Sequence, residues 1–390
     1  MDGVNVDAAF EAALKLGGVR GEALLQEDRV IPTGIWSLDW ALLQTGGIPV
    51  GRQVEMFGEP SSGKSLVLYR MVASAQRAFP DKYTAILDTE QSLQDRFGVM
   101  WMERQGVDLS KVSVFNATTA KEVFNICLHL VQSRAFSLIG VDSMAEVYPD
   151  DMLVTEKRDD LLDWGNIRPV AIDARAMTEF QKPIHKLCRM TDTTLVWINQ
   201  LRDKIGGRTS WGGDTYTTPG GYTFRYNQSV RLYLWTPGDV TETVAGTNYK
   251  EVVGRRVSIK VVKSKIGPHG GQTGVATPKP LEVVYGEEDV LQEGAVVLRL
   301  AVSLGIVSRS GAWYSFLAPG EDPAHPLKAQ GEDNFAATLH ATAYQDGWSM
   351  YGLVQYYVEQ ALRSRAEIHR KRVEEGEASE ESAEGEDPNA

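Results

Sequence analysis

Residues 56–65 decide the fold, and they read Met56-Phe57-Gly58-Glu59-Pro60-Ser61-Ser62-Gly63-Lys64-Ser65. They match the phosphate-loop pattern G-x-x-x-x-G-K-[ST], in which backbone N–H groups and a helix N-terminus face an anion. The stretch Gln53-Val54-Glu55-Met56-Phe57 reads as a strand before the loop, and apolar residues at helical spacing predict a helix over 66–79. A Gly/Ser turn with an exposed lysine is the alternative, but it does not explain why the Gly-Lys-Ser falls at the helix start.

This motif predicts a nucleotide site. Lys64 would reach the β- and γ-phosphates, and the Ser65 hydroxyl would bind Mg²⁺. The rest of the loop would surround the phosphates through Glu59, Pro60, Ser61, Ser62 and Gly63. ATP and Mg²⁺ are therefore the expected cofactors.

Strands and helices alternate from residue 31 to residue 286, which is typical of an α/β domain with a parallel sheet. Buried strands are expected at 54–57, 83–87, 112–115, 137–141, 194–198, 230–235 and 257–262. Helices are expected at 66–79, 92–105, 120–134 and 171–190. The last two strands should be antiparallel, because the polar segment 236–250 between them reads as a hairpin-like connection.

Three further segments flank this core. Residues 1–30 predict a helical arm that packs on something else, because a helix this small cannot bury itself. Residues 287–373 predict a smaller mixed domain that ends in a long helix from about residue 350 to 375. Residues 374–390 are acidic and poor in apolar side chains, so we expect them to be disordered.

Charge and composition indicate whether the chain could bind phosphates, span a membrane or be secreted. The net charge is −12, but eight of the 52 acidic residues lie in 374–390, so 44 acidic residues face 40 basic ones elsewhere. A nearly neutral body can still bind phosphates through local basic patches. No run of about 18 apolar residues predicts a membrane span, and the first residues do not resemble a secretory signal. Cys127 and Cys188 lack metal-ligand spacing and read as buried thiols in a reducing cytoplasm.

Hydrolysis needs an acid that orients Mg²⁺ and a base that orients water. Asp142 ends the apolar run 137–141 and is predicted to lie beside Mg²⁺; capping the next turn is its alternative role. Glu90 follows the strand at 83–87 and is predicted to activate water, with a plain surface acid as the alternative. Gln200 follows another strand and would sense the γ-phosphate. All three fall at carboxyl ends of strands, where open α/β sheets bind ligands.

The segment 201–226 reads LRDKIGGRTSWGGDTYTTPGGYTFRY. Its basic side chains interleave with aromatic ones, a combination that suits single-stranded nucleic acid. The basic residues are Arg202, Lys204, Arg208 and Arg225. A mobile substrate lid is the alternative, because long irregular loops are usually functional or disordered. Residues 151–169 form a weaker candidate with more acidic residues.

With these motifs in order, the chain resembles the RecA family of bacterial and phage DNA recombinases. The matching segments are 32–39, 46–52, 58–65, 88–90, 141–143, 198–202, 260–265, 285–286 and 311–315. The resemblance covers about residues 30–345. It implies a RecA-type P-loop ATPase core with a mostly parallel sheet, a short helical arm, a small α+β C-terminal domain and an acidic tail.

The resemblance also implies function. The chain would form helical filaments on single-stranded DNA, with ATP between neighbouring subunits, and exchange strands with homologous double-stranded DNA in recombination and repair. Lys263 and Lys265 would reach the neighbour's γ-phosphate; a solvated strand edge is their alternative role. Phe97 would lie against adenine, and Tyr285 near the base from the next subunit.

The positions that match DNA contacts of the family are Arg175, Arg202, Lys204, Ile205, Gly220 and Gly221, and we add the basic residue Arg208. Ile205 would insert between base steps. Both loops are longer than usual in the family, and 151–169 is also more acidic, which suggests a divergent member, with a phage origin as a hypothesis. Contacts of 151–169 therefore cannot be transferred residue by residue.

Two other functions compete with this interpretation. A ring helicase or another RecA-core motor should lack the Lys263/Lys265 pair and the segment 311–315, and a zinc-bearing repair relative would need four paired cysteines. A structural protein that binds nucleotide without turnover would not need Glu90. The Lys263/Lys265 pair, the segment 311–315 and Glu90 are all present in this chain, and the recombinase interpretation agrees with each of them.

Overall fold

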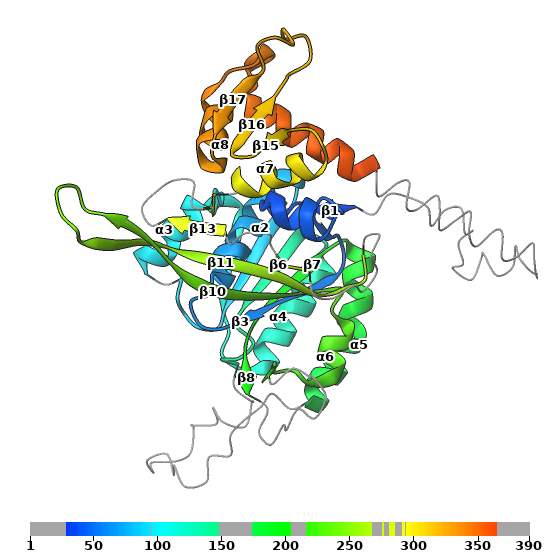
Figure 1. Cartoon of the computed structure of the whole chain (residues 1–390). Helices are drawn as coiled ribbons and strands as arrows, with labels where there is room; N and C mark the ends of the chain where they lie inside the picture. The colour runs from blue at the N-terminus through cyan, green and yellow to red at the C-terminus, as the bar shows by residue number, and fades with distance from the viewer. Residues whose placement is uncertain are drawn as a thin grey trace, which may run out of the picture.

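The computed structural model describes residues 29–93, 95–147, 174–203, 216–266, 275–276, 281–284, 291–292 and 294–364. One large sheet crosses the core, with strand order β14-β13-β11-β10-β3-β7-β6-β4-β5 and β12 paired to β11 (Figure 1). From β10 to β5 all neighbours are parallel. β11 runs antiparallel to β10, as its sequence predicted. The expected α/β fold with a mostly parallel sheet is confirmed.

The strands of this sheet are β3 (Gln53–Gly58), β4 (Tyr83–Asp88), β5 (Val112–Asn116), β6 (Phe136–Asp142), β7 (Thr194–Gln200), β10 (Val230–Thr243), β11 (Lys250–Ser264), β12 (Val275–Ala276), β13 (Leu281–Val284) and β14 (Leu291–Gln292). Two short pairs lie outside it, β1 (Val30–Ile31) with β2 (Ile48–Pro49) and β8 (Arg202–Asp203) with β9 (Tyr216–Thr217).

Side chains alternate along the strands between two apolar clusters, one on each face of the sheet. On β7, Val196 and Ile198 pack with α2 (Lys64–Ala78), while Leu195 and Trp197 pack on the opposite face. That opposite face is covered by α4 (Ala120–Ser133), α5 (Ala174–Thr191) and α6 (Gly221–Asn227). Because both faces are covered, the central strands are rich in apolar residues, although polar side chains such as that of Glu55 on β3 are also buried in them.

Capping residues determine where the core helices begin. α3 (Arg96–Arg104) starts after Asp95, whose side chain accepts a hydrogen bond from the N–H of Gly98 at 2.8 Å. The helix expected at 92–105 therefore begins at residue 96, because the Asp95 carboxylate caps its first turn. α4 begins after Thr119, which forms a capping box with Glu122.

The connection predicted at 236–250 is mostly strand. β10 and β11 continue pairing to Thr243 and Lys250, and Figure 1 shows the two-stranded ribbon projecting beyond the other strands. The pairing shifts register at three places, which allows the ribbon to bend and accommodates Pro237.

The C-terminal part, drawn in yellow to red at the top of Figure 1, has its own apolar cluster. Its elements are α7 (Gly294–Ser303), β15 (Ser308–Ser310), β16 (Trp313–Phe316), β17 (Leu327–Gln330), α8 (Glu332–Ala341) and a helix over 350–364. Trp36, beside the helical turn Ser37–Leu42, joins this cluster and donates a hydrogen bond to the Glu359 carboxylate at 2.6 Å.

The domain boundaries at 286 and 373 remain predictions, and residues 1–28 and 365–390 lie outside the described chain. No helix in the described part is long and apolar enough to cross a membrane.

A fully buried carboxylate, that of Glu55 on β3, joins three strands. It accepts hydrogen bonds from Arg231 Nε of β10 and, at 3.0 Å, from Asn199 Nδ2 of β7. The Arg231 guanidinium also lies 4.7 Å from the centroid of the Phe57 ring. Without Arg231, this charge would be buried without its cation.

We therefore expect Arg231→Met to lower the free energy of unfolding by about 3 kcal/mol, because it leaves an uncompensated buried charge. Urea unfolding monitored by tryptophan fluorescence measures it. Arg256→Met, on the same hairpin, is the control and should change stability by less than about 0.5 kcal/mol. Adding Glu55→Gln to Arg231→Met should recover part of the loss; equal stability of the single and double variants would contradict the role of this ion pair.

Candidate nucleotide-binding site

A cavity of about 740 Å³ lies where β3, β4, β6 and β7 reach their carboxyl ends. It is lined by Pro60, Ser61, Ser62, Gly63, Lys64, Ser65, Leu66, Tyr69, Glu90, Ser92, Asp95, Phe97, Gly98, Trp101, Asp142, Ile198, Gln200, Arg255 and Val257. Most of the residues predicted for the nucleotide are therefore brought together. Glu59 is in the loop but not among the lining residues.

The phosphate loop joins β3 to α2. Gly63, the residue before α2, has a φ of +86°, and a Cβ there would approach Val257 Cγ2 at 3.1 Å. A side chain at this position would thus face both backbone strain and a close contact. The Lys64 ammonium is buried and donates to the carbonyls of Gly58 at 3.2 Å and Glu59 at 2.6 Å. Burial lowers the pKa of Lys64, while the Asp142 and Glu90 carboxylates oppose that shift. These carbonyls hold the cation at the loop, where an anion can replace them.

Ser65 and Asp142 meet beneath the loop. Ser65 Oγ donates to Asp142 Oδ2 at 2.6 Å. Burial raises the pKa of Asp142 to about 6, and the Ser65 hydrogen bond and Lys64 oppose that shift. A hydroxyl and a carboxylate are oxygen ligands of the kind Mg²⁺ prefers, and it usually binds through one or two carboxylates plus phosphate. These two residues fit that ion, and the described residues contain no cluster of three acidic, His or Cys side chains that would suggest another metal.

Thr89 connects the loops that follow β4 and β6. Its hydroxyl accepts from the Ser143 N–H at 2.6 Å and donates to the Ser143 carbonyl at 2.7 Å, while its own N–H donates to the Asp142 carbonyl at 2.7 Å. The next residue, Glu90, is exposed in the cavity. Thr89 therefore holds Glu90 and Asp142 at the same end of the cavity.

Gln200, at the end of β7, also lines the cavity. Its Nε2 donates to Glu146 Oε1 at 3.2 Å, and its backbone N–H donates to Asn199 Oδ1 at 3.1 Å. Asn199 Nδ2 in turn donates two hydrogen bonds, one to the Pro219 carbonyl at 3.1 Å and one to the Glu55 carboxylate. A short hydrogen-bonded path thus runs from the cavity to the segment just before α6.

Aromatic rings form the end of the cavity at α3. Phe97 is 68% exposed, although it is a large apolar side chain. Trp101 lies one turn later on the same helix and lines the same cavity. Such an exposed ring beside a phosphate loop offers a stacking surface for a planar base. Tyr285, the other aromatic residue expected near the base, lies outside the described residues.

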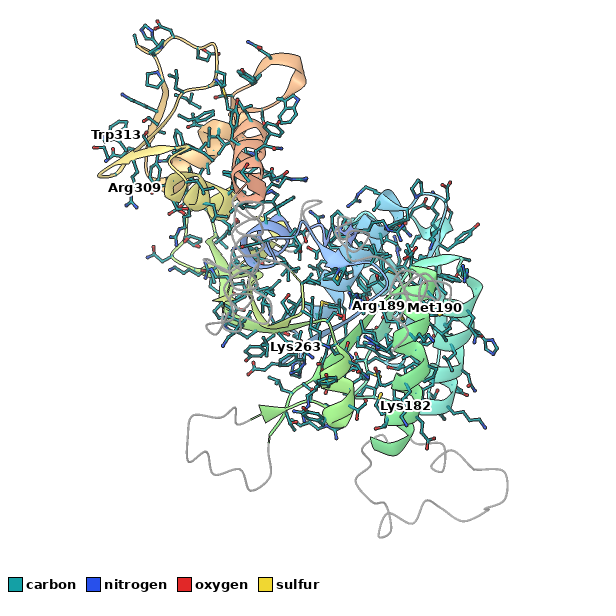
Figure 2. All side chains as sticks on the ribbon, turned by 90° about the vertical axis from the view of Figure 1, so that its right-hand side faces the viewer. Lys182, Arg189, Met190, Lys263, Arg309 and Trp313 are labelled. Carbon is teal, nitrogen blue, oxygen red and sulfur yellow. The ribbon has the colours of Figure 1, made fainter. Side chains whose placement is uncertain are left out.

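Lys263 and Lys265 are not at this cavity. Lys263 pairs with Arg231 at the beginning of β10, and thus lies at the opposite edge of the sheet from the phosphate loop. Lys263 Nζ donates to the carbonyls of Arg225 at 2.9 Å and Tyr226 at 2.6 Å, and Lys265 Nζ donates to Tyr226 at 2.9 Å. Figure 2 shows Lys263 beside the helices that cover the α5 and α6 face of the sheet. Burial, followed by the neighbouring Lys265, lowers the pKa of Lys263 to about 8.

The DNA-contact candidates are only partly described. Arg202 is exposed on β8, and Arg175 falls in the first turn of α5. Gly220 precedes α6 with a φ of +98°, and a Cβ there would meet the Phe224 ring at 2.9 Å, so a glycine is required. Gly221 begins α6. Lys204, Ile205 and Arg208 lie outside the described residues.

Several lining residues were not predicted from the sequence. Tyr69 could have been found, because it follows Ser65 by four residues and so shares its face of α2. Trp101 follows Phe97 at the same spacing. Arg255 and Val257 carried no signal, since only the pairing of β11 with β10 brings them to the loop. Local spacing thus identifies residues on one helix, but not residues on distant strands.

Comparisons with known proteins agree on one family. The model of the RecA N-terminal domain matches residues 6–287. The protein named Protein RecA from Heliobacterium modesticaldum is 33% identical over 314 residues, which cover 80% of this chain and 81% of that protein. The Protein RecA of Syntrophus aciditrophicus is 31% identical over 292 residues, covering 75% and 76%. That of Kineococcus radiotolerans is 33% identical over 317 residues, covering 80% and 82%.

The contacts of Thr89 generate a prediction. Thr89→Val keeps the shape of the side chain but leaves the Ser143 N–H and carbonyl without these buried partners, so unfolding should cost about 1–3 kcal/mol less. Urea unfolding measures the change. Thr241→Val, on the exposed part of the hairpin, is the control and should stay close to the wild type. An unchanged midpoint for Thr89→Val would contradict the connecting role of this hydroxyl.

Proposed function

The chain belongs to the RecA family, and we propose that it is an ATP-dependent recombinase that assembles into helical filaments on single-stranded DNA. It then pairs this strand with homologous double-stranded DNA in recombination and repair, in the cytoplasm of a bacterium or of a phage-infected host. The observation that carries the proposal is the single cavity that unites Lys64, Ser65, Asp142, Glu90 and Gln200. These residues are of the types that bind phosphates, hold Mg²⁺ and activate water in phosphoryl transfer.

The proposed hydrolysis follows from their positions. The loop N–H groups and Lys64 would bind the β- and γ-phosphates, and Ser65 and Asp142 would hold Mg²⁺, which would neutralise charge on the phosphate oxygens. Glu90, whose neighbour Thr89 bonds to the loop after β6, would accept a proton from the attacking water. The water oxygen would bond to the γ-phosphorus while the bond from that phosphorus to the β–γ bridging oxygen breaks, and ADP would leave with this oxygen. Phe97 stacks against the adenine, and Tyr285 approaches it from a neighbouring subunit.

Assembly would complete the site. Lys263 and Lys265 lie at the edge of the sheet opposite the cavity, so they cannot reach the γ-phosphate of their own subunit. Head-to-tail stacking of two copies would bring the lysine edge of one to the cavity of the next, and the cations would stabilise the transferring phosphate in trans. Hydrolysis would then depend on assembly.

Binding to DNA would be coupled to the nucleotide through Gln200. When its side chain turns to the γ-phosphate it leaves Glu146, and the backbone bond to Asn199 carries the change to Pro219. Gly220 and Gly221 follow directly, and Arg175, Arg202, Lys204, Ile205 and Arg208 contribute the remaining proposed DNA contacts. Positive charge would bind the backbone, while apolar side chains separate or stack bases.

The test is ATP hydrolysis measured with and without single-stranded DNA, with negative-stain images of the same samples. DNA-stimulated turnover together with helical filaments is the expected result. Closed rings, or turnover that ignores DNA, would contradict the proposal and indicate another motor built on the same core.

Glu90→Gln should lower kcat by at least about 100-fold, the usual contribution of a general base, because the amide cannot accept the proton. Nucleotide affinity and filament formation should remain. Steady-state hydrolysis and fluorescent nucleotide titration measure the two effects. Glu103→Gln, on the exposed side of α3 and away from the cavity, is the matched control. Wild-type kcat in Glu90→Gln would exclude Glu90 as the base.

The lowered pKa of Lys263 predicts a pH dependence. With a pKa of about 8, Lys263 is cationic at pH 7 and loses its charge as the pH rises through 8. Assembly with ATP should therefore weaken between pH 7 and 9, as measured by light scattering. Lys263→Arg should retain assembly at pH 9, because a guanidinium stays protonated. Lys250→Arg, at the exposed start of β11, should behave as the wild type; a pH response in Lys263→Arg equal to wild type would reject Lys263 as its origin.

A further inference from the structure

One cation reaches the nucleotide cavity from a strand rather than from the phosphate loop. Arg255 of β11 is among the lining residues, and its Nη1 donates to the Ser61 carbonyl at 3.4 Å. The neighbouring strand position on the same face, Val257, is the residue nearest to the position of a Cβ on Gly63. β11 therefore packs against the phosphate loop at two successive inward positions, and Arg255 lies at its rim.

The present partners of Arg255 hold it weakly. The bond to Ser61 is long, and the ion pair with Asp239 of β10 joins Nε and Oδ1 at 3.8 Å. The Arg255 side chain is 43% exposed, so it can reorient without disturbing the core. A phosphate oxygen, which forms short charge-assisted bonds with a guanidinium, would replace the more distant Asp239 carboxylate.

The described lining of the cavity holds more acidic than basic side chains, so a second cation there would favour the binding of phosphates. Among the described lining residues, Lys64 and Arg255 are positive, whereas Glu90, Asp95 and Asp142 carry carboxyl groups. A nucleotide adds several negative charges to this acidic surrounding. Without Arg255, Lys64 would be the one positive side chain that the described lining offers to the phosphates.

We propose that Arg255 is a nucleotide-binding residue that contacts the phosphates of the nucleotide in its own subunit. The inference rests on the proposed binding of ATP in this cavity. It deepens that function by adding a contact in cis, provided by the same strand that carries Lys263 to the opposite edge. On binding, the guanidinium leaves Asp239 and bridges the Ser61 carbonyl and a phosphate oxygen.

Arg256 provides a matched control, because neighbouring residues of a strand point to opposite faces. Its guanidinium donates to the Asp239 carbonyl at 2.8 Å, and it is not among the residues that line the cavity. A substitution at 256 therefore changes the same charge on the same hairpin without touching the proposed contact.

The experiment titrates fluorescent ADP and an ATP analogue into the full-length chain with Mg²⁺ and without DNA, and uses adenosine as a competitor. Arg255→Met should weaken both phosphorylated nucleotides by at least about tenfold, the factor that corresponds to one charge-assisted hydrogen bond. Arg255→Lys should recover part of the affinity, and Arg256→Met should stay within about twofold of wild type. Adenosine, which lacks phosphates, should compete equally well in all variants.

The outcomes separate this inference from the proposed function. Wild-type nucleotide affinity in Arg255→Met would overturn the inference, while DNA-stimulated hydrolysis could still support the recombinase. An equal loss for adenosine would also overturn it, since the pocket itself would then be altered. If the wild type binds nucleotide but ignores DNA, the recombinase proposal fails and the Arg255 result still stands.

Discussion

The buried carboxylate of Glu55 is the constraint on which the arrangement of the core depends. A charge removed from water must be compensated by close partners, and here the partners come from different strands, Arg231 of β10 and Asn199 of β7. The same groups continue outward, since Arg231 also donates to Thr218 Oγ1 at 3.3 Å and Asn199 to the Pro219 carbonyl. The register of three strands and the start of α6 are thereby linked to one another.

This link lies between the candidate nucleotide cavity and the segment proposed to contact DNA. On one side, Gln200 reaches the cavity and bonds to Asn199. On the other side, Thr218 and Pro219 lead to Gly220 and α6, the segment proposed to contact DNA. A fully satisfied polar network transmits displacement better than an apolar contact, because its hydrogen bonds tolerate little change in length or angle. Coupling between nucleotide and DNA would follow from the hydrogen bonds of residues 199 and 55.

β11 connects the regions in a different way. Arg255 lies at the cavity, and Lys263 lies eight residues later at the opposite edge, roughly 26 Å away at the usual rise of a strand. Val262 is unpaired in the register with β10, and this bulge turns Lys263 toward the face of α6 while Val261 stays in the core of α2. In the proposed assembly, one strand would contact the nucleotide of its own subunit at one end and that of a neighbour at the other.

The sequence by itself determined the phosphate loop, the alternation of strands and helices, and the carboxyl-end positions of Glu90, Asp142 and Gln200. These are local properties, since glycine conformation, apolar periodicity and the common edge of parallel strands follow from neighbouring residues. The start of α3 differs from the prediction because it depends on the cap at Asp95. The hairpin predicted at 236–250 contains more strand than expected, because β10 and β11 continue to pair there. The comparisons established the family, and the individual site roles and domain boundaries remain predictions.

Only the tertiary structure decided the rest. It brought Arg255 and Val257 to the loop, placed the Lys263/Lys265 pair at the opposite edge, and assembled the contacts of Glu55 and Thr89. Each of these depends on which strands become neighbours and in what register. The contacts of Glu55, Thr89 and Arg255 join residues more than 50 positions apart in the chain. Pairing of distant strands is determined by packing of the whole core, and no short-range pattern in the sequence encodes it.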